Sequence, residues 1–128
     1  MTGMETSYQK GFEALNTAQK QAVEETEGPV MVVAGPGTGK TQVLALRIAH
    51  ILEKTDVGAD AVLCLTFTRS GVSAMRVRLE SYIGSTARNV NISTFHGFAG
   101  NIVEKYYSVL DFDRAPVSLD DTEAVLLV

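Results

Sequence analysis

The sequence predicts a mixed α/β fold in which helices cross over between the strands of a parallel sheet. Three short apolar or β-branched runs, 30–34, 61–65 and 90–94, alternate with longer segments of helical periodicity. The first two runs are apolar throughout, which is typical of strands buried on both faces, whereas the third alternates and fits a position nearer an edge. The length of 128 residues suits one domain, and 45% apolar residues exclude a disordered class.

Four helices are expected around these runs. Asn16 can cap a helix over about 17–25, because Gln19 stands where it can complete a capping box. The second helix joins the first two strands and ends before Gly58, the third joins the next two strands, and the fourth follows the last strand. Their apolar stripes are Leu44, Ile48, Ile51 and Leu52, then Val72, Met75, Leu79, Tyr82 and Ile83, then Phe95, Phe98, Ile102 and Tyr106.

The end of the sequence is acidic and then apolar. Another capping pattern starts at Ser118, and the apolar run 124–128 is interpreted as the start of an element that is cut short. The longest apolar runs are five residues, against roughly 20 for a spanning helix, so no membrane partner is expected. No apolar leader opens the sequence, and the single cysteine, Cys64, fits a small buried hydrophobe, so the expected location is cytoplasmic.

The segment 34–41, Ala-Gly-Pro-Gly-Thr-Gly-Lys-Thr, follows an apolar run and opens an expected helix. Glycines let backbone N–H groups turn toward phosphate oxygens, and a helix N-terminus adds partial positive charge. Lys40 can extend along the β- and γ-phosphates of ATP, and the Thr41 hydroxyl can ligate Mg²⁺. A strand-to-helix turn without a ligand is the alternative, but it gives no reason for Lys and Thr after the last glycine. The predicted nucleotide-binding residues are Gln19, Gly35, Pro36, Gly37, Thr38, Gly39, Lys40, Thr41 and Gln42, with Lys40 and Thr41 as candidate catalytic residues and Thr41 as the magnesium ligand.

Three further blocks accompany this loop in a fixed order. Upstream stands 15–22, Leu-Asn-Thr-Ala-Gln-Lys-Gln-Ala; downstream stand Leu-Thr-Phe-Thr at 65–68, with Met75 and Arg76 beyond it, and Ile-Ser-Thr-Phe-His-Gly at 92–97. With the loop, these blocks resemble the Q motif and motifs I, Ia and Ib of the UvrD/Rep-type superfamily 1 DNA helicases. The resemblance covers about 15–110 and implies a RecA-like P-loop NTPase fold, of which 1–128 would be the N-terminal part.

The resemblance implies roles for these blocks. Gln19 would read adenine through a bidentate amide pair, with helix capping as its alternative role. The two downstream blocks follow predicted strands, where ligand-facing loops of parallel sheets lie, and would contact single-stranded DNA through hydroxyls and stacked aromatic rings. The alternative is that Phe67, Phe95 and His96 are ordinary packing residues. The predicted DNA-binding residues are Thr66, Phe67, Thr68, Arg69, Thr94, Phe95 and His96.

The sequence departs from the common family pattern at two places. Relatives often have Thr-Phe-Thr-Asn-Lys-Ala-Ala where this chain has Thr-Phe-Thr-Arg-Ser-Gly-Val at 66–72, and Gln42 stands where relatives often have a basic residue. The first change moves a positive charge by one residue and keeps it. We therefore expect DNA binding to survive with altered contacts.

The sequence also lacks two features that ATP hydrolysis needs in this family. No acidic pair follows an apolar strand, and no second motor domain supplies transition-state arginines. We therefore expect an ATP-dependent 3′-to-5′ DNA helicase of repair or recombination as the parent, with this chain binding nucleotide and forming part of the DNA track. A stand-alone, non-hydrolysing ATP-binding module is the alternative. The absence of an Asn-Lys-x-Asp motif and of an arginine-rich lid disfavours a GTPase and a small kinase.

The net charge of −4 is unevenly distributed. From residue 111 onward there are five acids and one base, which accounts for the whole excess, so 1–110 holds ten acids and ten bases. Between the second and third expected strands, Arg69, Arg76, Arg78 and Arg88 oppose Glu80, a local excess of 4 − 1 = +3. A nucleic-acid partner is therefore compatible with the charge of the part that carries the motifs.

Overall fold

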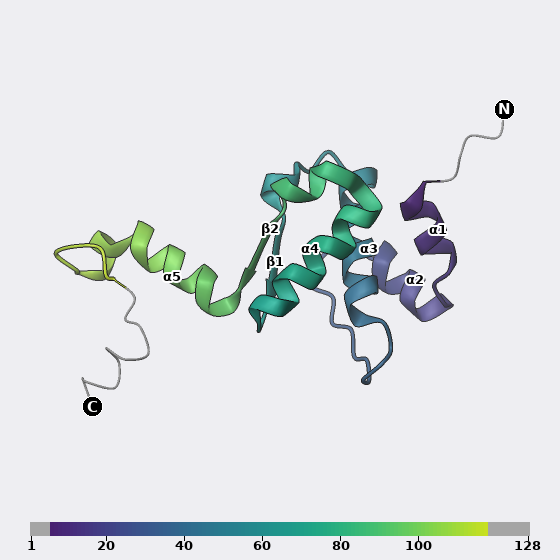
Figure 1. Ribbon diagram of the computed structural model, residues 1–128, viewed down its shortest axis with the longest axis horizontal. Coiled ribbons are helices and arrows are strands. Elements are labelled where there is room, and N and C mark those ends of the chain that lie inside the picture. The colour runs from purple at the N-terminus through teal and green to yellow at the C-terminus, as the bar shows by residue number, and fades with distance from the viewer. Residues whose placement is uncertain (1–5, 118–128) are drawn as a thin grey trace.

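A computed structural model describes residues 6–117 of the protein (Figure 1). In chain order the helices and strands are α1 (Ser7–Glu13), α2 (Thr17–Glu24), α3 (Lys40–Lys54), β1 (Leu63–Thr66), α4 (Arg69–Ile83), β2 (Asn91–Thr94) and α5 (Phe95–Lys105), with short 3-10 helices η1 (Ala59–Ala61), η2 (Gly84–Asn89) and η3 (Tyr107–Leu110). The mixed α/β class is confirmed, and the four expected helices are α2, α3, α4 and α5. The capping pattern at Ser118 and the run 124–128 lie outside the described residues.

The sheet consists of two parallel strands, β1 and β2, in the part of the chain that the structure describes. Their register pairs Leu63 with Asn91 and Thr66 with Thr94, so both strands end at the same edge. Helix α4 makes the crossover between them, as the sequence predicts for a parallel pair. The loops that leave this edge therefore start from neighbouring positions.

The first predicted strand, 30–34, is wrong. This segment has no strand structure, and the side chains of Met31 and Val33 are each 88% exposed. An apolar run indicates a preference for burial, but a strand also needs a neighbouring strand to hydrogen-bond its backbone. Among residues 6–117, β1 pairs with β2 and neither pairs with this segment. The predicted three-stranded sheet is therefore two-stranded here.

The core lies among α1, α2, α3 and α4 and one side of the sheet (Figure 1). Its largest fully buried side chains come from four different elements or their flanks and are Val23, Leu46, Leu79 and Val90. Cys64 is also buried, as predicted, and burial raises the pKa of its thiol. The stripe predicted for α4 lies in this core, but the buried side of α3 consists of Ala45, Leu46, Ile48 and Ala49, and Leu44 of the stripe predicted there is 39% exposed.

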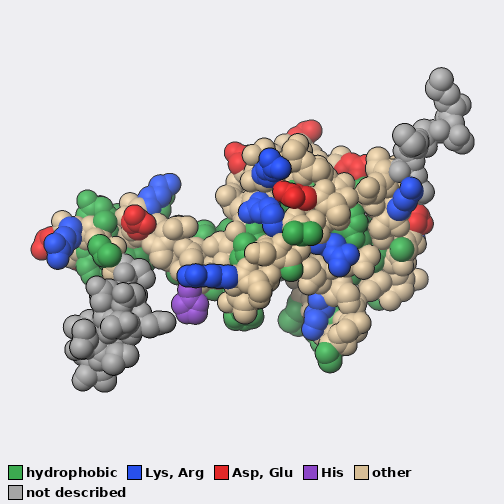
Figure 2. Space-filling model, viewed as in Figure 1, with side chains coloured by type: hydrophobic (Ala, Val, Ile, Leu, Met, Phe, Trp, Pro, Cys, Tyr) green, Lys and Arg blue, Asp and Glu red, His purple; other side chains and the backbone are tan. Residues whose placement is uncertain are grey.

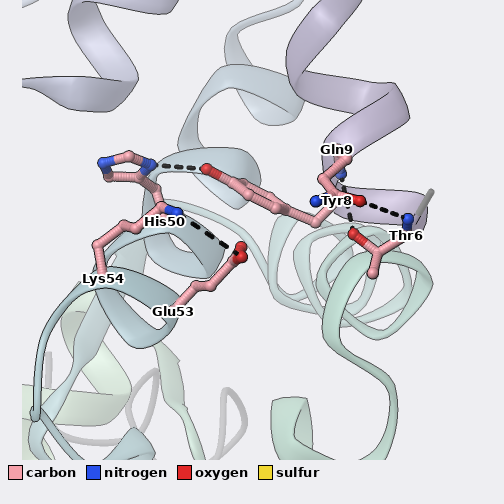
Figure 3. A network of polar contacts seen from close by, with 6 residues as sticks. All are labelled: Thr6, Tyr8, Gln9, His50, Glu53 and Lys54. Atoms are coloured by element: carbon pink, nitrogen blue, oxygen red, sulfur yellow. Dashed lines mark hydrogen bonds and ion pairs between the residues drawn. The ribbon is translucent and has the colours of Figure 1, made fainter. Parts of the chain in front are cut away.

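Helix α1 is a feature that the sequence analysis missed. A capping box between Thr6 and Gln9 starts it, and the Tyr8 hydroxyl lies 2.6 Å from Nδ1 of His50 on α3 (Figure 3). The Phe12 ring stacks on His50 with centroids 6.2 Å apart. Burial, with a smaller contribution from Glu53, raises the pKa of Tyr8 to about 12. The Thr-x-x-Gln spacing was the available signal for this helix.

Helix α5 extends away from the body of the molecule (Figure 1). None of its residues is buried, and the side chains of Phe95, Ile102 and the C-cap residue Tyr106 are 41–46% exposed. Hydrophobic side chains are visible on the surface of the arm in Figure 2. The predicted apolar stripe therefore exists but is not covered by other residues of 6–117. Within the same range, no helix combines the length and hydropathy needed to cross a membrane.

Candidate functional site

The loop 34–41 joins the exposed segment 30–34 to the first turn of α3. Gly37 and Gly39 each have φ of +73°, a left-handed conformation that favours glycine. Gly39 is the N-cap residue of α3 and makes no side-chain cap, so the N–H groups of the first turn are left for other acceptors. The loop therefore has the backbone geometry of an anion-binding turn at a helix N-terminus.

A cavity of about 810 Å³ lies between this loop and α2. Seven of the nine predicted nucleotide-binding residues line it: Gln19, Gly35, Gly37, Thr38, Gly39, Lys40 and Gln42. Pro36 and Thr41 belong to the same loop and helix start but are not part of the lining. The cavity is also lined by Arg47 of α3, which is not among the residues predicted from the sequence. Tertiary contact thus joins two motifs that are about 20 residues apart in sequence.

Gln19 has the helix-capping role that the sequence offered as its alternative. Its Oε1 accepts a hydrogen bond from the Asn16 N–H at 3.0 Å, and its own N–H donates to Asn16 Oδ1 at 2.9 Å, so the capping box is confirmed. Its Nε2 donates to the Thr38 carbonyl at 3.1 Å. A primary amide has two N–H donors and two acceptor lone pairs, so one of each remains for a ligand. Base reading by Gln19 stays a prediction.

Within the loop, polar side chains fold back onto the backbone. The Thr38 hydroxyl donates to the Gly35 carbonyl at 2.6 Å, and the Lys40 ammonium lies 3.4 Å from the Ala34 carbonyl. The contact of Lys40 is long, so exchanging it for phosphate oxygens would cost little. The Lys40 ammonium, the Thr41 hydroxyl and the free N–H groups at the start of α3 form a set of groups that fits a magnesium-bound nucleoside triphosphate.

A second group of predicted residues gathers at the edge where β1 and β2 end. The Phe67 and Phe95 rings lie with centroids 5.0 Å apart, and Phe67 is 85% exposed. Phe67 is therefore not a core residue among residues 6–117, although its ring packs against Phe95. A cavity of about 710 Å³ beside the rings is lined in part by Phe67, Arg69, Thr94 and His96.

The threonines at this edge also start the helices that follow. Thr68 Oγ1 accepts from the Gly71 N–H at 3.0 Å and caps α4, and Thr94 Oγ1 accepts from the Gly97 N–H at 3.0 Å and caps α5. A capping hydroxyl still has its own hydrogen to donate. The sequence analysis had assigned these threonines to DNA and missed the caps, which a threonine directly before each helical stripe could have indicated.

The arginines near this edge have different surroundings. Arg76 Nη1 donates to the Ala87 and Val90 carbonyls at 2.7 and 2.9 Å, and Arg88 lies 3.5 Å from Glu80. These two side chains therefore hold α4 and η2 together. Arg69 lines the second cavity instead, so of these three it is the one placed beside Phe67 and Thr94.

The described fold and its two cavities define a mixed α/β protein with a glycine-rich helix-start loop and a separate aromatic edge. Residues 15–128 match the model of the UvrD/REP helicase N-terminal domain, and the chain belongs to this family. It is similar to the ATP-dependent DNA helicase PcrA of Staphylococcus epidermidis, with 36% identity over 109 residues, and to that of Staphylococcus aureus, with 37% identity over 109 residues. These matches cover 85% of the chain but 15% of each relative's length.

Proposed function

We propose that this chain is the ATP-binding portion of an ATP-dependent 3′-to-5′ DNA helicase that acts in repair or recombination. The observation that carries the proposal is the hydrogen bond from Gln19 Nε2 to the Thr38 carbonyl, because it joins α2 to the loop 34–41 around one cavity. Membership in this family and the similarity to the ATP-dependent DNA helicase PcrA support it. The proposed fold of the motor domain is the RecA-like parallel sheet, begun by β1 and β2.

In this proposal the predicted nucleotide-binding residues have distinct tasks. Lys40 holds the β- and γ-phosphates, and the N–H groups at the start of α3 bind phosphate oxygens. Thr41 is the residue that would hold Mg²⁺, which supplies charge neutralisation at the phosphates. Gln19 recognises adenine with the amide donor and acceptor that its internal contacts leave free. Gly37 and Gly39 permit the left-handed turns that expose the N–H groups.

The second cavity is proposed as part of the single-stranded DNA track. Phe67 offers an exposed ring for stacking, and the Phe95 ring packs against it at a tilt with centroids 5.0 Å apart. Arg69 and His96 line the same cavity and can contact the phosphate backbone. The hydroxyls of Thr66, Thr68 and Thr94 are further donors at this edge.

Hydrolysis and unwinding are proposed for a longer parent protein that includes a second motor domain. Transition-state stabilisation requires an acidic pair and arginines in addition to the groups described. The alternative, a stand-alone ATP-binding module that does not hydrolyse, predicts a well-covered apolar surface. Met31 and Val33 are 88% exposed and α5 has no buried residue among 6–117, and these observations favour the motor-domain proposal.

Nucleotide binding is tested by titrating the chain with a fluorescent ribose-labelled ATP analogue in the presence of Mg²⁺. We expect saturable binding by the wild type and strongly weakened binding by Lys40→Ala. Lys54→Ala, at the other end of α3, is the matched control because it removes the same charge from the same helix. Equal and negligible binding by wild type and Lys40→Ala would overturn the proposal.

DNA-stimulated ATPase activity separates the two candidates for this chain. We expect no significant turnover by the chain alone and DNA-stimulated turnover by the full-length parent. Robust turnover by the chain alone would contradict the assignment of hydrolysis to a longer protein. A full-length parent without ATPase would contradict the helicase assignment itself.

A further inference from the structure

The side chain of Arg47 connects the two elements that form the first cavity. It stands seven residues after Lys40 on α3, which is about two helical turns. Its Nη1 donates to the Ala22 carbonyl at 2.6 Å and also to the Glu25 carbonyl, and one Nη atom has two hydrogens with which to do so. Arg47 is half-buried and lines the cavity.

The two acceptors of Arg47 lie at the C-terminal end of α2. This helix spans Thr17–Glu24 with Glu25 as its C-cap, so the carbonyls of Ala22 and Glu25 have no partner within the helix. A guanidinium is favourable at this position because it satisfies these carbonyls and complements the partial negative charge of the helix end. Arg47 therefore caps α2 from a neighbouring helix.

Helix α2 packs directly against α3, but its own buried apolar contribution to this packing is small. It is eight residues long and buries one apolar side chain, Val23. At its N-terminal end the contact to the loop is the hydrogen bond from Gln19 to Thr38, and the connection from α2 to α3 passes through the exposed segment 30–34. Because Ala22 is one turn after Gln19, the contacts of Arg47 fix the helix turn that carries the Gln19 amide.

From this arrangement we propose that Arg47 is a positioning residue that sets the place of Gln19 over the loop and thereby determines adenine selectivity. The inference rests on the proposed nucleotide-binding function and assigns its base selectivity to a residue outside the four motifs. Arg47 acts through α2 and Gln19, whereas Lys40 acts on phosphates. The two contributions are therefore separable by comparing nucleotides that differ in the base.

The experiment measures the dissociation constants of the chain for ribose-labelled ATP and GTP analogues. We expect Gln19→Ala to reduce the preference for ATP by about 5- to 150-fold, the range for one bidentate base contact. Arg47→Met is expected to lose most of the same preference, and the double variant is expected to lose no more than Gln19→Ala alone. Lys40→Ala is expected to weaken both analogues to a similar extent.

Arg76→Met is the matched control. Arg76 is a part-buried arginine whose Nη1 also donates to two carbonyls, those of Ala87 and Val90, but it holds η2 and lies away from the cavity. We expect both Arg76→Met and Arg47→Met to lower the melting temperature. We expect Arg76→Met to leave the ratio of ATP to GTP affinity unchanged. A merely structural role for Arg47 predicts the same behaviour as Arg76.

Three outcomes overturn the inference. An unchanged ATP-to-GTP ratio in folded Arg47→Met overturns the inference and leaves the proposed function intact. A double variant that loses far more of the ATP preference than Gln19→Ala also overturns it, because this would indicate direct contact between Arg47 and the base. Absence of binding by the wild type overturns the proposed function and the inference together. If Arg47→Met does not fold, Arg47→Lys replaces it, because an ammonium keeps the charge without the planar guanidinium. The ATP-to-GTP ratio of Arg47→Lys is then expected to lie between those of the wild type and Gln19→Ala. A wild-type ratio refutes the inference.

Discussion

Gly71 offers a sharp test of how the edge of the sheet is packed. It is the third residue of α4, where replacing glycine with alanine in a helix normally stabilises by about 1 kcal/mol. A Cβ at this position would collide with Thr66 Oγ1 and lie 3.1 Å from Thr68 Oγ1, the hydroxyl that caps the Gly71 N–H. The helix gain is therefore opposed by a steric conflict and by displacement of a cap.

The expected net effect of Gly71→Ala is destabilisation. Overpacking costs typically 1–3 kcal/mol and loss of a threonine cap costs about 1 kcal/mol, so after the helix gain a net loss of about 1–3 kcal/mol remains. Urea denaturation followed by circular dichroism measures the change in the free energy of unfolding.

Gly100→Ala is the matched control, because Gly100 is inside α5 and a Cβ there would meet no atom within 4 Å. We expect this variant to be as stable as the wild type or more stable. The reasoning also predicts that Thr66→Ala removes the main collision, so Gly71→Ala should cost less in that background. If Gly71→Ala stabilises the chain as Gly100→Ala does, the close approach of Thr66 to α4 is refuted.

Three further predictions follow from burial, exposure and protonation. Leu79→Ala should lower the free energy of unfolding by about 2–5 kcal/mol, since the Leu79 side chain on α4 is fully buried in the core. A loss below about 1 kcal/mol in a urea titration would contradict this packing. Phe67→Ala should weaken binding of an oligo-dT strand by about 1–3 kcal/mol and leave the urea midpoint nearly unchanged, because the ring is 85% exposed. Unchanged DNA affinity in fluorescence anisotropy would argue against stacking. Val77→Ala, which alters another exposed apolar residue, is the control. The pKa of Tyr8 is raised from 10.0 to about 12, so the folded state holds this proton more tightly than the unfolded state, and the stability that depends on it is complete below about pH 10 and lost as the pH rises toward 12. Tyr8→Phe should remove that part of the pH dependence in denaturation curves measured across this window, and an unaltered pH profile would contradict the assignment.

Local signals in the sequence predicted most of the helices correctly. Asn16 and Gln19 form the expected capping box, and the predicted stripe of α4 from Val72 to Ile83 packs into the core. These predictions succeeded because caps and periodic stripes depend on residues within one or two turns. Helix α1 has the same kind of signal at Thr6 and Gln9, so its omission was a failure to read a local pattern.

Strand pairing could not be predicted in the same way. Residues 30–34 have the composition of a buried strand, yet a strand exists only where another strand supplies hydrogen bonds. Among residues 6–117 no strand lies beside this run, whereas β1 and β2 pair because α4 returns the chain to the same place. Composition reports a preference for burial and says nothing about which partner is present.

The sequence by itself determined the mixed α/β class, the glycine-rich loop and the family resemblance, since these depend on residue types at short spacing. The tertiary structure decided which of these residues meet. It placed Gln19 against Thr38, placed Phe67 against Phe95, and made Arg47 a cap for α2. Such contacts depend on how helices pack across long sequence separations, and no short sequence pattern encodes which distant backbone group or ring an arginine or phenylalanine side chain will contact.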